Sequence, residues 1–232
     1  MDFLTPQEWQ AVRLSFVVAT RSVLVSLPFA VLVAWLLARG RFVGRSWLDA
    51  FVHLPLVLPP VVTGWLLLLL FGVRGPLGAL LQDWFGVRLV FTANGAALAT
   101  AVMSFPLLVR AIRLSLESID TGLEQAARTL GARPLDRFFS ITLPLMAPGI
   151  LAGTVTAFAA GLGEFGAVIT FASNVQGETQ TLPLAIYSAT QTPGGEATAA
   201  KLSLISFVLA VAALLFADRL SRRVQRWIGR TT

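Results

Sequence analysis

The chain has 232 residues, of which 56% are hydrophobic and 13% are charged, and its mean hydropathy is +0.76. This composition is too apolar for an ordinary soluble domain and predicts an integral membrane protein. The formal net charge of +6 does not indicate nucleic-acid binding, because the arginines gather beside apolar segments, where they determine membrane topology. Cysteine is absent, which excludes disulfides and thiolate metal sites within the chain.

Several apolar segments are long enough to cross a membrane, whose hydrocarbon core takes about 20 helical residues. There are five, and they cover residues 16–38, 52–73, 95–116, 145–171 and 199–217. The sequence therefore predicts an all-α integral membrane protein in which residues 1–232 form a single transmembrane domain with five transmembrane helices. Membrane lipid is the expected partner of its apolar faces.

The arginines predict the orientation of these helices. They gather at the ends of the first, third and fifth segments, in the ranges 39–45, 110–137 and 219–230. The loop of residues 172–196 has no basic residue. Basic loops remain in the cytoplasm, so we expect the amino terminus outside and the carboxyl terminus inside. Arg13 and Arg21 then lie near the outer end of the first helix, where we expect residues 5–21 to form a partly interfacial extension.

A polar stretch, residues 117–144, separates the third and fourth segments. It cannot lie in lipid, because its backbone groups and arginines would lack hydrogen-bond partners there. We expect a helix from Asp120 to Leu130, with Asp120 or Thr121 as its cap and Glu124 in its first turn. In the aqueous phase this helix would offer a docking surface to a soluble partner.

Glycine and proline punctuate the rest of the polar stretch. Gly131 is expected to end the first helix. Pro134 is expected to open a second short helix through about Ser140, and Pro144 to turn the chain back into the membrane. A solvated linker is the alternative, but linkers rarely combine an amphipathic pattern with such ordered punctuation.

The polar stretch also carries a spaced motif: QAA from Gln125, three residues, Gly131, nine residues, and ITLP ending at Pro144. It resembles the EAA loop of binding-protein-dependent ABC importer permeases, which reads E-A-A, three residues, Gly, nine residues, I-x-L-P. Gln125 stands where that family usually has Glu, and Glu124 precedes it. The resemblance implies that the ATPase-coupling residues are Asp120, Glu124, Gln125, Ala126, Ala127, Gly131, Leu143 and Pro144.

Other stretches are similar to bacterial molybdate permeases, chiefly residues 53–70, 102–117 and 161–171, with GETQTLPLAIY and QTPGGEA in the last outer loop. The resemblance implies the type I ABC importer (MetI-like) fold, with coupling helices in the cytoplasm. It also implies a permease subunit that moves molybdate or tungstate across the bacterial cytoplasmic (inner) membrane by alternating access. Sulfate and thiosulfate permeases share the GEFGA element that starts at Gly163, so a sulfate or thiosulfate importer is the alternative.

The partners follow from the same resemblance. It implies a second copy of the chain, two ATP-binding subunits, and a periplasmic or surface molybdate-binding protein, with no nucleic acid. The sequence has no G-x-x-x-x-G-K-[ST] phosphate loop, and its single lysine, Lys201, lacks that context. We therefore expect a non-catalytic subunit without a cofactor of its own, and ATP and Mg²⁺ bound by the partner ATPase.

Prolines interrupt the second apolar segment at Pro55, Pro59 and Pro60, and each of them removes a backbone donor. Such a break either lines a pathway as a hinge or merely improves helix packing, and both remain open. Glu164 lies among glycines in the fourth segment, where a carboxylate needs a partner. Because a carboxylate repels an oxyanion, we expect a hinge or gate there, or glycine packing across a homodimer interface.

A tetrahedral oxyanion prefers neutral donors in fixed positions. The apolar segments offer the hydroxyls of Thr63, Ser104, Thr154, Thr156 and Thr170. Most such hydroxyls bond to their own helix backbone, so we expect no tight substrate site in this chain. The candidates for a pathway or gate are Pro59, Pro60, Thr63, Ser104, Pro106, Gly163, Glu164 and Gly166.

An intramembrane enzyme is the alternative from a different class. It would need a nucleophile with a base, or a metal cluster. The chain has no cysteine and one histidine, His53. We therefore expect neither a catalytic residue nor a metal site.

Overall fold

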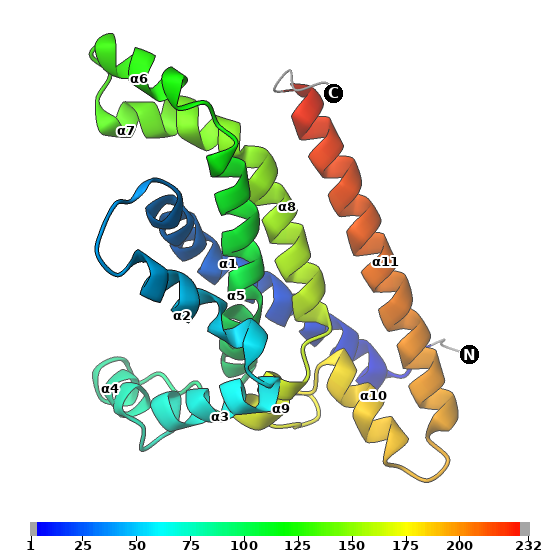
Figure 1. The fold of residues 1–232 in the computed structure, drawn as a ribbon. Helices are drawn as coiled ribbons and strands as arrows, with labels where there is room; N and C mark the ends of the chain where they lie inside the picture. The colour runs from blue at the N-terminus through cyan, green and yellow to red at the C-terminus, as the bar shows by residue number, and fades with distance from the viewer. Residues whose placement is uncertain (1–3, 228–232) are drawn as a thin grey trace.

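The computed structural model describes residues 4–227, which form helices and connections without a β-strand in that range (Figure 1). The all-α prediction is confirmed. The helices are α1 (Pro6–Arg39), α2 (Arg45–Val57), α3 (Pro60–Phe71), α4 (Pro76–Phe85), α5 (Ala93–Glu117), α6 (Thr121–Thr129), α7 (Pro134–Arg137), the π-helical turn η1 (Phe138–Thr142), α8 (Leu143–Leu162), α9 (Gly166–Ala172), α10 (Leu182–Thr190) and α11 (Glu196–Trp227). Arg230, which contributed to the predicted orientation, lies outside the described residues.

The described helices that are long and apolar enough to cross a membrane number four: Pro6–Arg39, Ala93–Glu117, Pro134–Leu162 and Glu196–Phe216. The predicted second segment, 52–73, is a bent pair instead, because α2 and α3 differ in direction by 116°. The described helices provide a fifth membrane span only if α2 and α3 together count as one span. The bend falls at Leu58 and Pro59, where a residue before proline is driven to extended backbone. Pro60 then starts α3, whereas Pro55 lies inside α2.

The fourth segment, expected as one helix over 145–171, is divided in two. α8 ends at Leu162 and α9 begins at Gly166. In the break, the carboxylate of Glu164 accepts a hydrogen bond at 2.9 Å from the backbone N–H of Ala167. This bond satisfies one of the free amides at the start of α9. Apolar length therefore does not produce a single helix here.

The membrane helix that precedes this break begins earlier than expected. Pro134 starts α7 as predicted, but the helical run continues through η1 and α8 to Leu162. The prediction that Pro144 turns the chain was wrong. Pro144 has no N–H to donate to the carbonyl one turn back, and the turn before it widens to the π pattern, in which the Leu143 N–H bonds to the Phe138 carbonyl.

The first membrane helix is a continuous 34-residue helix, so the expected extension over residues 5–21 and the first span are one element. Thr5 and Glu8 form a capping box at its start. Arg13 is exposed, and Arg21 donates a hydrogen bond to the Asn94 side chain at 2.9 Å.

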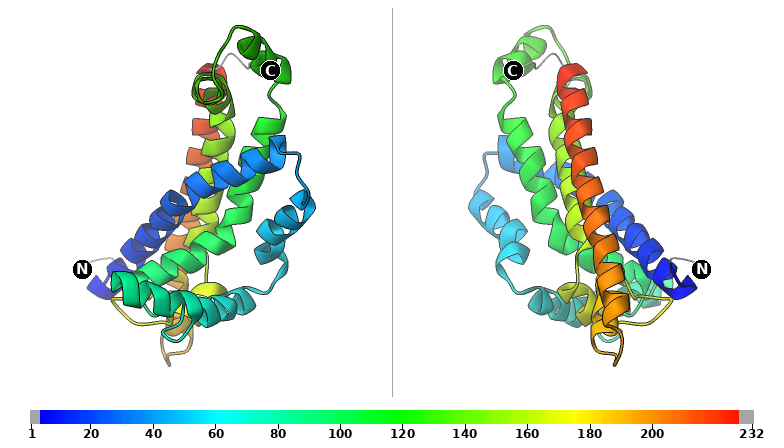
Figure 2. Two further views of the ribbon diagram at one scale, coloured as in Figure 1. Left: turned by 90° about the vertical axis from the view of Figure 1, so that its left-hand side faces the viewer. Right: turned by 90° about the vertical axis from the view of Figure 1, so that its right-hand side faces the viewer.

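α5 lies at the centre of the bundle, packed between α1 and α8 (Figure 2). The side chains of Leu108, Val109, Ile112 and Leu116 on α5 are fully buried. α8 approaches closely at Gly153, where an added methyl group would lie 3.0 Å from Cδ1 of Leu108. α1, α5 and α8 therefore form a tightly packed body to which the two ends of the molecule attach.

Short helices gather at the two ends of this body. α3, α4, α9 and α10 lie at one end, and α6 and α7 at the other, on the side where α11 ends (Figure 1). Neither α4 nor α10 was predicted, and only the first-turn prolines Pro76 and Pro183 signal them in the sequence. Leu24, Phe29 and Phe207 are 64%, 61% and 67% exposed, as suits faces that contact lipid or partner helices.

Candidate docking loop and pathway residues

α6 forms where the local sequence predicts a helix. The Asp120 carboxylate caps it by accepting a hydrogen bond from the Gly122 N–H at 2.8 Å. Glu124 and Arg128 lie in its first and last turns, where they complement the helix dipole. Gly131 follows with a φ of 85°, the left-handed conformation that favours glycine. The observed helix lies within one residue of its predicted bounds at each end.

The outer surface of this loop faces solvent. No residue of α6 is buried, and Leu123 and Leu130 are 49% and 87% exposed. Gln125 and Ala126 of the motif are also exposed, while Ala127 is half-buried. An exposed amphipathic helix with apolar side chains on its free face fits a docking surface for another protein.

The end of the motif lies at the base of the loop. Leu143 packs against the buried cluster that contains Leu116 and Met146, whereas Pro144 is exposed. The motif thus has an anchoring end on the bundle and a free end at α6.

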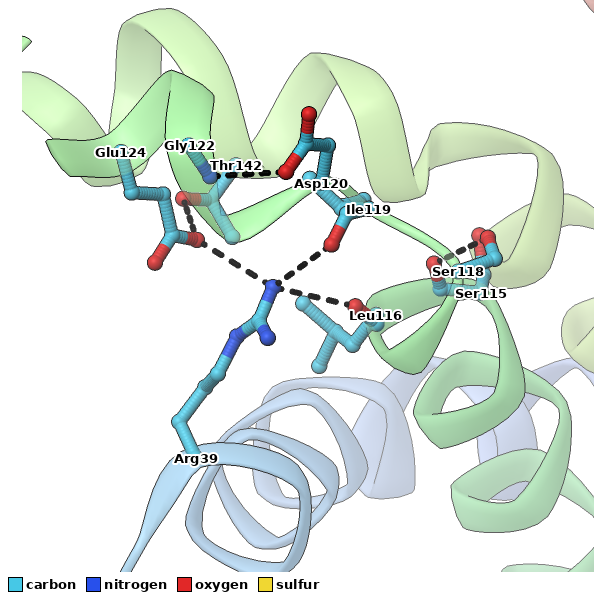
Figure 3. Close-up of polar contacts among 9 residues, drawn as sticks. All are labelled: Arg39, Ser115, Leu116, Ser118, Ile119, Asp120, Gly122, Glu124 and Thr142. Atoms are coloured by element: carbon cyan, nitrogen blue, oxygen red, sulfur yellow. Dashed lines mark hydrogen bonds and ion pairs between the residues drawn. The ribbon is translucent and has the colours of Figure 1, made fainter. Parts of the chain in front are cut away.

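Glu124 points toward the bundle rather than toward the free surface (Figure 3). Its Oε1 accepts a hydrogen bond from Oγ1 of Thr142 at 3.1 Å and lies 3.6 Å from Nη2 of Arg39 at the end of α1. The same nitrogen donates to the carbonyls of Leu116 and Ile119, at 3.2 and 3.4 Å. From the sequence, Arg39 contributes only to the predicted membrane orientation. No local pattern predicts its pairing with Glu124, because the two residues are far apart in the chain.

Two of the pathway candidates, Pro60 and Gly166, meet where α3 crosses α9. A methyl group on Gly64 would lie 2.8 Å from the Ala167 carbonyl oxygen, and one on Gly166 would lie 2.7 Å from Cβ of Pro60. The two backbones touch because neither position has a side chain. At Gly166 the close packing is thus within one chain. A methyl group on Gly163 would meet nothing closer than 3.7 Å, so Gly163 is not needed for packing.

The candidate hydroxyls fall into two groups. Ser104, Thr156 and Thr170 donate to carbonyls of their own helices at 2.9, 2.8 and 2.8 Å, as predicted for most of them. The hydroxyls of Thr63 and Thr154 are buried and have no hydrogen-bond partner in the described part of the chain. Thr63 lines a hollow of about 690 Å³ between α1, α2, α3 and α5 whose walls are almost entirely apolar. Such a hollow does not suit an anion.

A charged cleft of about 600 Å³ between α2 and α5 was not predicted. Arg113 donates to Asp49 on α2 at 3.0 Å and to Glu117 at 2.8 Å. The bond to Asp49 holds the first turns of α2 to the last turns of α5, while the bond to Glu117 lies within α5. Pro106, a pathway candidate, is buried inside α5.

Within residues 4–227, no group of three or more His, Cys, Asp or Glu side chains is placed to hold a metal ion. Membrane-length apolar helices, a packed body around α5 and an exposed amphipathic helix at one end together define a membrane-spanning protein with a helical loop outside the apolar region.

The chain belongs to the family described as binding-protein-dependent transport system inner membrane component, which it matches over residues 26–226. It is 58% identical over 227 residues to the Molybdenum transport system permease protein ModB of Escherichia coli K12, covering 98% of this chain and 99% of that protein. It is 36% identical over 222 residues to the Sulfate transport system permease protein CysT of Salmonella typhimurium, covering 94% of this chain and 80% of that protein.

Two solved structures share the fold. One is a bacterial alginate ABC transporter in complex with its alginate-bound periplasmic protein, with a TM-score of 0.76 at 20% identity over 96% of this chain and 81% of that chain. The other is the MetNI methionine ABC transporter in an inward-facing conformation, with a TM-score of 0.65 at 17% identity over 94% of each chain. The predicted type I importer fold is confirmed.

Proposed function

We propose that this chain is the permease subunit of an ATP-driven molybdate importer in a bacterial cytoplasmic membrane. The observation that carries the proposal is the 58% sequence identity, over 98% of this chain, to a permease named for molybdenum. The identity to the sulfate permease is lower, at 36%. Tungstate resembles molybdate in size and charge and is expected to use the same path. A sulfate or thiosulfate importer is the weaker alternative.

The energy for transport comes from a separate subunit in this proposal. The sequence has no phosphate-binding loop of the G-x-x-x-x-G-K-[ST] type, so ATP and Mg²⁺ bind to an ATPase that docks on α6. Two permease copies present two docking loops to two ATPase copies. Closure of the ATPases displaces the loops, and the body of α1, α5 and α8 moves with them, because packed helices shift as units. The permease itself does no covalent chemistry.

The path for the anion lies between the two copies, and an external binding protein delivers molybdate to its outer mouth. The crossing of α3 and α9 lies at the end of the bundle opposite α6 (Figure 1), where it would act as the outer gate. The Glu164 carboxylate is engaged with the Ala167 N–H, which supports a structural role in that gate rather than contact with an anion.

The arrangement also supports the predicted orientation. α6 and the end of α11 lie at one end of the bundle, and the start of α1 lies toward the other (Figures 1 and 2). An ATPase in the cytoplasm then requires the carboxyl terminus inside and the amino terminus outside.

Deletion of the gene tests the substrate. Cells without this chain should contain less molybdenum at low external molybdate, measured by elemental analysis, and should recover when the gene is restored. Excess external molybdate should also restore the content through slower routes. Unchanged molybdenum together with poor growth on limiting sulfate would favour the sulfate alternative.

A further inference from the structure

In the described part of the chain, the side-chain bonds from α6 to other helices come from one residue. No residue of α6 is buried. Within the described residues, Glu124 is the only residue of α6 whose side chain bonds to another element, and its partners are Thr142 in η1 and Arg39 in α1. Successive helical residues differ in direction by about 100°, and the neighbouring Gln125 is exposed. Glu124 therefore contacts the bundle, whereas Gln125 is available on the docking side.

Arg39 joins three elements at one point (Figure 3). It pairs with Glu124 of α6 and donates to the Leu116 and Ile119 carbonyls at the end of α5, while its own backbone forms the last turn of α1. The side chains of Arg39 and Glu124 are 19% and 24% exposed, so solvent screens the pair less than it would on an open surface. A shift of Glu124 consequently acts on the ends of α1 and α5 together.

The space beside this pair leaves little direct contact between the loop and α1. A cleft of about 410 Å³ lies between α1 and the loop, with Leu32 and Trp35 on one wall and Leu135 and Phe138 on the other. A closely packed interface would transmit motion through many contacts. The open cleft concentrates the direct link between α6 and α1 in the ion pair, whereas the other link runs through α5.

We propose that Arg39 is a positioning residue that transmits the movement of docked α6 to α1 and α5. When the ATPase displaces α6, Glu124 carries the guanidinium with it, and the guanidinium carries the end of α5 and the last turn of α1. The proposal rests on the proposed function, because it needs an ATPase on α6. It also assigns Glu124, which precedes the position of the family's usual acid, to an internal contact.

The first test measures coupling in the reconstituted complex, as molybdate taken up per ATP hydrolysed. Arg39→Gln and Glu124→Gln should each lower this ratio by at least about fivefold, the lower end of typical coupling effects, while the ATPase still copurifies. The double variant should be no worse than either single variant, because all three lack the same pair. Arg41→Gln is the control, since Arg41 is an exposed cation two residues after Arg39, in the connection between α1 and α2, and it should retain the ratio of the unmodified complex.

The second test follows the movement itself. The sequence has no cysteine, so spin labels at Thr20→Cys on α1 and Arg128→Cys on α6, both exposed positions, report one distance when only one copy is labelled. In the otherwise unmodified complex, ATP should leave this distance unchanged, because α1 and α6 move together. In the Arg39→Gln background, ATP should change it.

The outcomes distinguish the role of Arg39 from the proposed function. An unaltered uptake ratio in Arg39→Gln, additive losses in the double variant, or the same ATP response of the spin-label distance with and without Arg39 would overturn the role of Arg39. Absence of molybdate uptake by the unmodified complex would instead overturn the proposed function.

Discussion

Pro60 and Gly166 touch where α3 crosses α9, so closely that a methyl group on Gly166 would lie 2.7 Å from Cβ of Pro60. Pro60 starts α3 and Gly166 starts α9. The contact therefore joins the two helix breaks that divide the apolar segments 52–73 and 145–171. Two irregular backbone stretches brought together at one end of a membrane bundle support each other, as broken membrane helices require.

Replacing Gly166 by alanine should force α3 and α9 apart. Overpacking of this kind costs about 1–3 kcal/mol, so the thermal unfolding midpoint of the purified protein should fall and molybdate uptake should decrease. Gly163→Ala is the matched control, because its methyl group would meet nothing closer than 3.7 Å. Equal losses in the two variants would contradict the packing role of Gly166.

Glu164→Gln should preserve transport, and Glu164→Ala should not. The glutamine oxygen can still accept the hydrogen bond that the carboxylate now takes from the Ala167 N–H. Alanine leaves that amide unpaired at a cost of about 1 kcal/mol, as for other lost caps. Uptake and thermal unfolding of both variants provide the measurement. Loss of transport in Glu164→Gln would show that the charge, rather than the cap, is needed.

Gly131→Ala should weaken coupling through the backbone rather than through bulk. Open space surrounds the position, but its φ of 85° is left-handed, and an L-residue with a Cβ pays about 1–2 kcal/mol there. Asparagine tolerates this conformation better, so uptake per ATP should follow the order Gly, Asn, Ala, with membrane insertion intact. Gly177→Ala carries the same strain, at a φ of 82° outside the docking loop. An equal loss of coupling in Gly177→Ala would contradict a specific role for the loop.

Lys201→Met should loosen α11 from the start of α1. The Lys201 ammonium lies 2.6 Å from the Glu8 carboxylate, whose side chain is only 9% exposed. Removing the cation leaves that carboxylate without its charged partner and should destabilise the protein by about 1–3 kcal/mol. The double variant Lys201→Met/Glu8→Gln should regain part of the loss in a thermal unfolding assay. A double variant less stable than Lys201→Met would refute the pairing as the cause.

The docking loop was predictable because its signals are local. The Asp120 cap, the first-turn Glu124 and the left-handed Gly131 act within a few residues of the helix that they delimit. The spacing of the family motif indicates the same boundaries for this helix. Short-range capping thus determined both the existence and the bounds of α6.

The break in residues 145–171 and the long-range pairs were not predictable in the same way. Hydropathy over residues 145–171 reports the apolar length of the segment but not the helix stop before Gly166. The π turn before Pro144 has no period of its own in the sequence. The pairing of Arg39 with Glu124 depends on how α1 packs against α5, which only the tertiary structure determines.

ATP-driven uptake of labelled molybdate into vesicles is the direct measurement of whether this chain belongs to a molybdate importer. The vesicles should contain this chain with its cognate ATPase and binding protein, and excess sulfate or tungstate should be added in parallel. For a molybdate permease, uptake should require ATP and should be blocked by tungstate but not by sulfate. Uptake without ATP, or uptake blocked equally well by sulfate, would contradict this assignment.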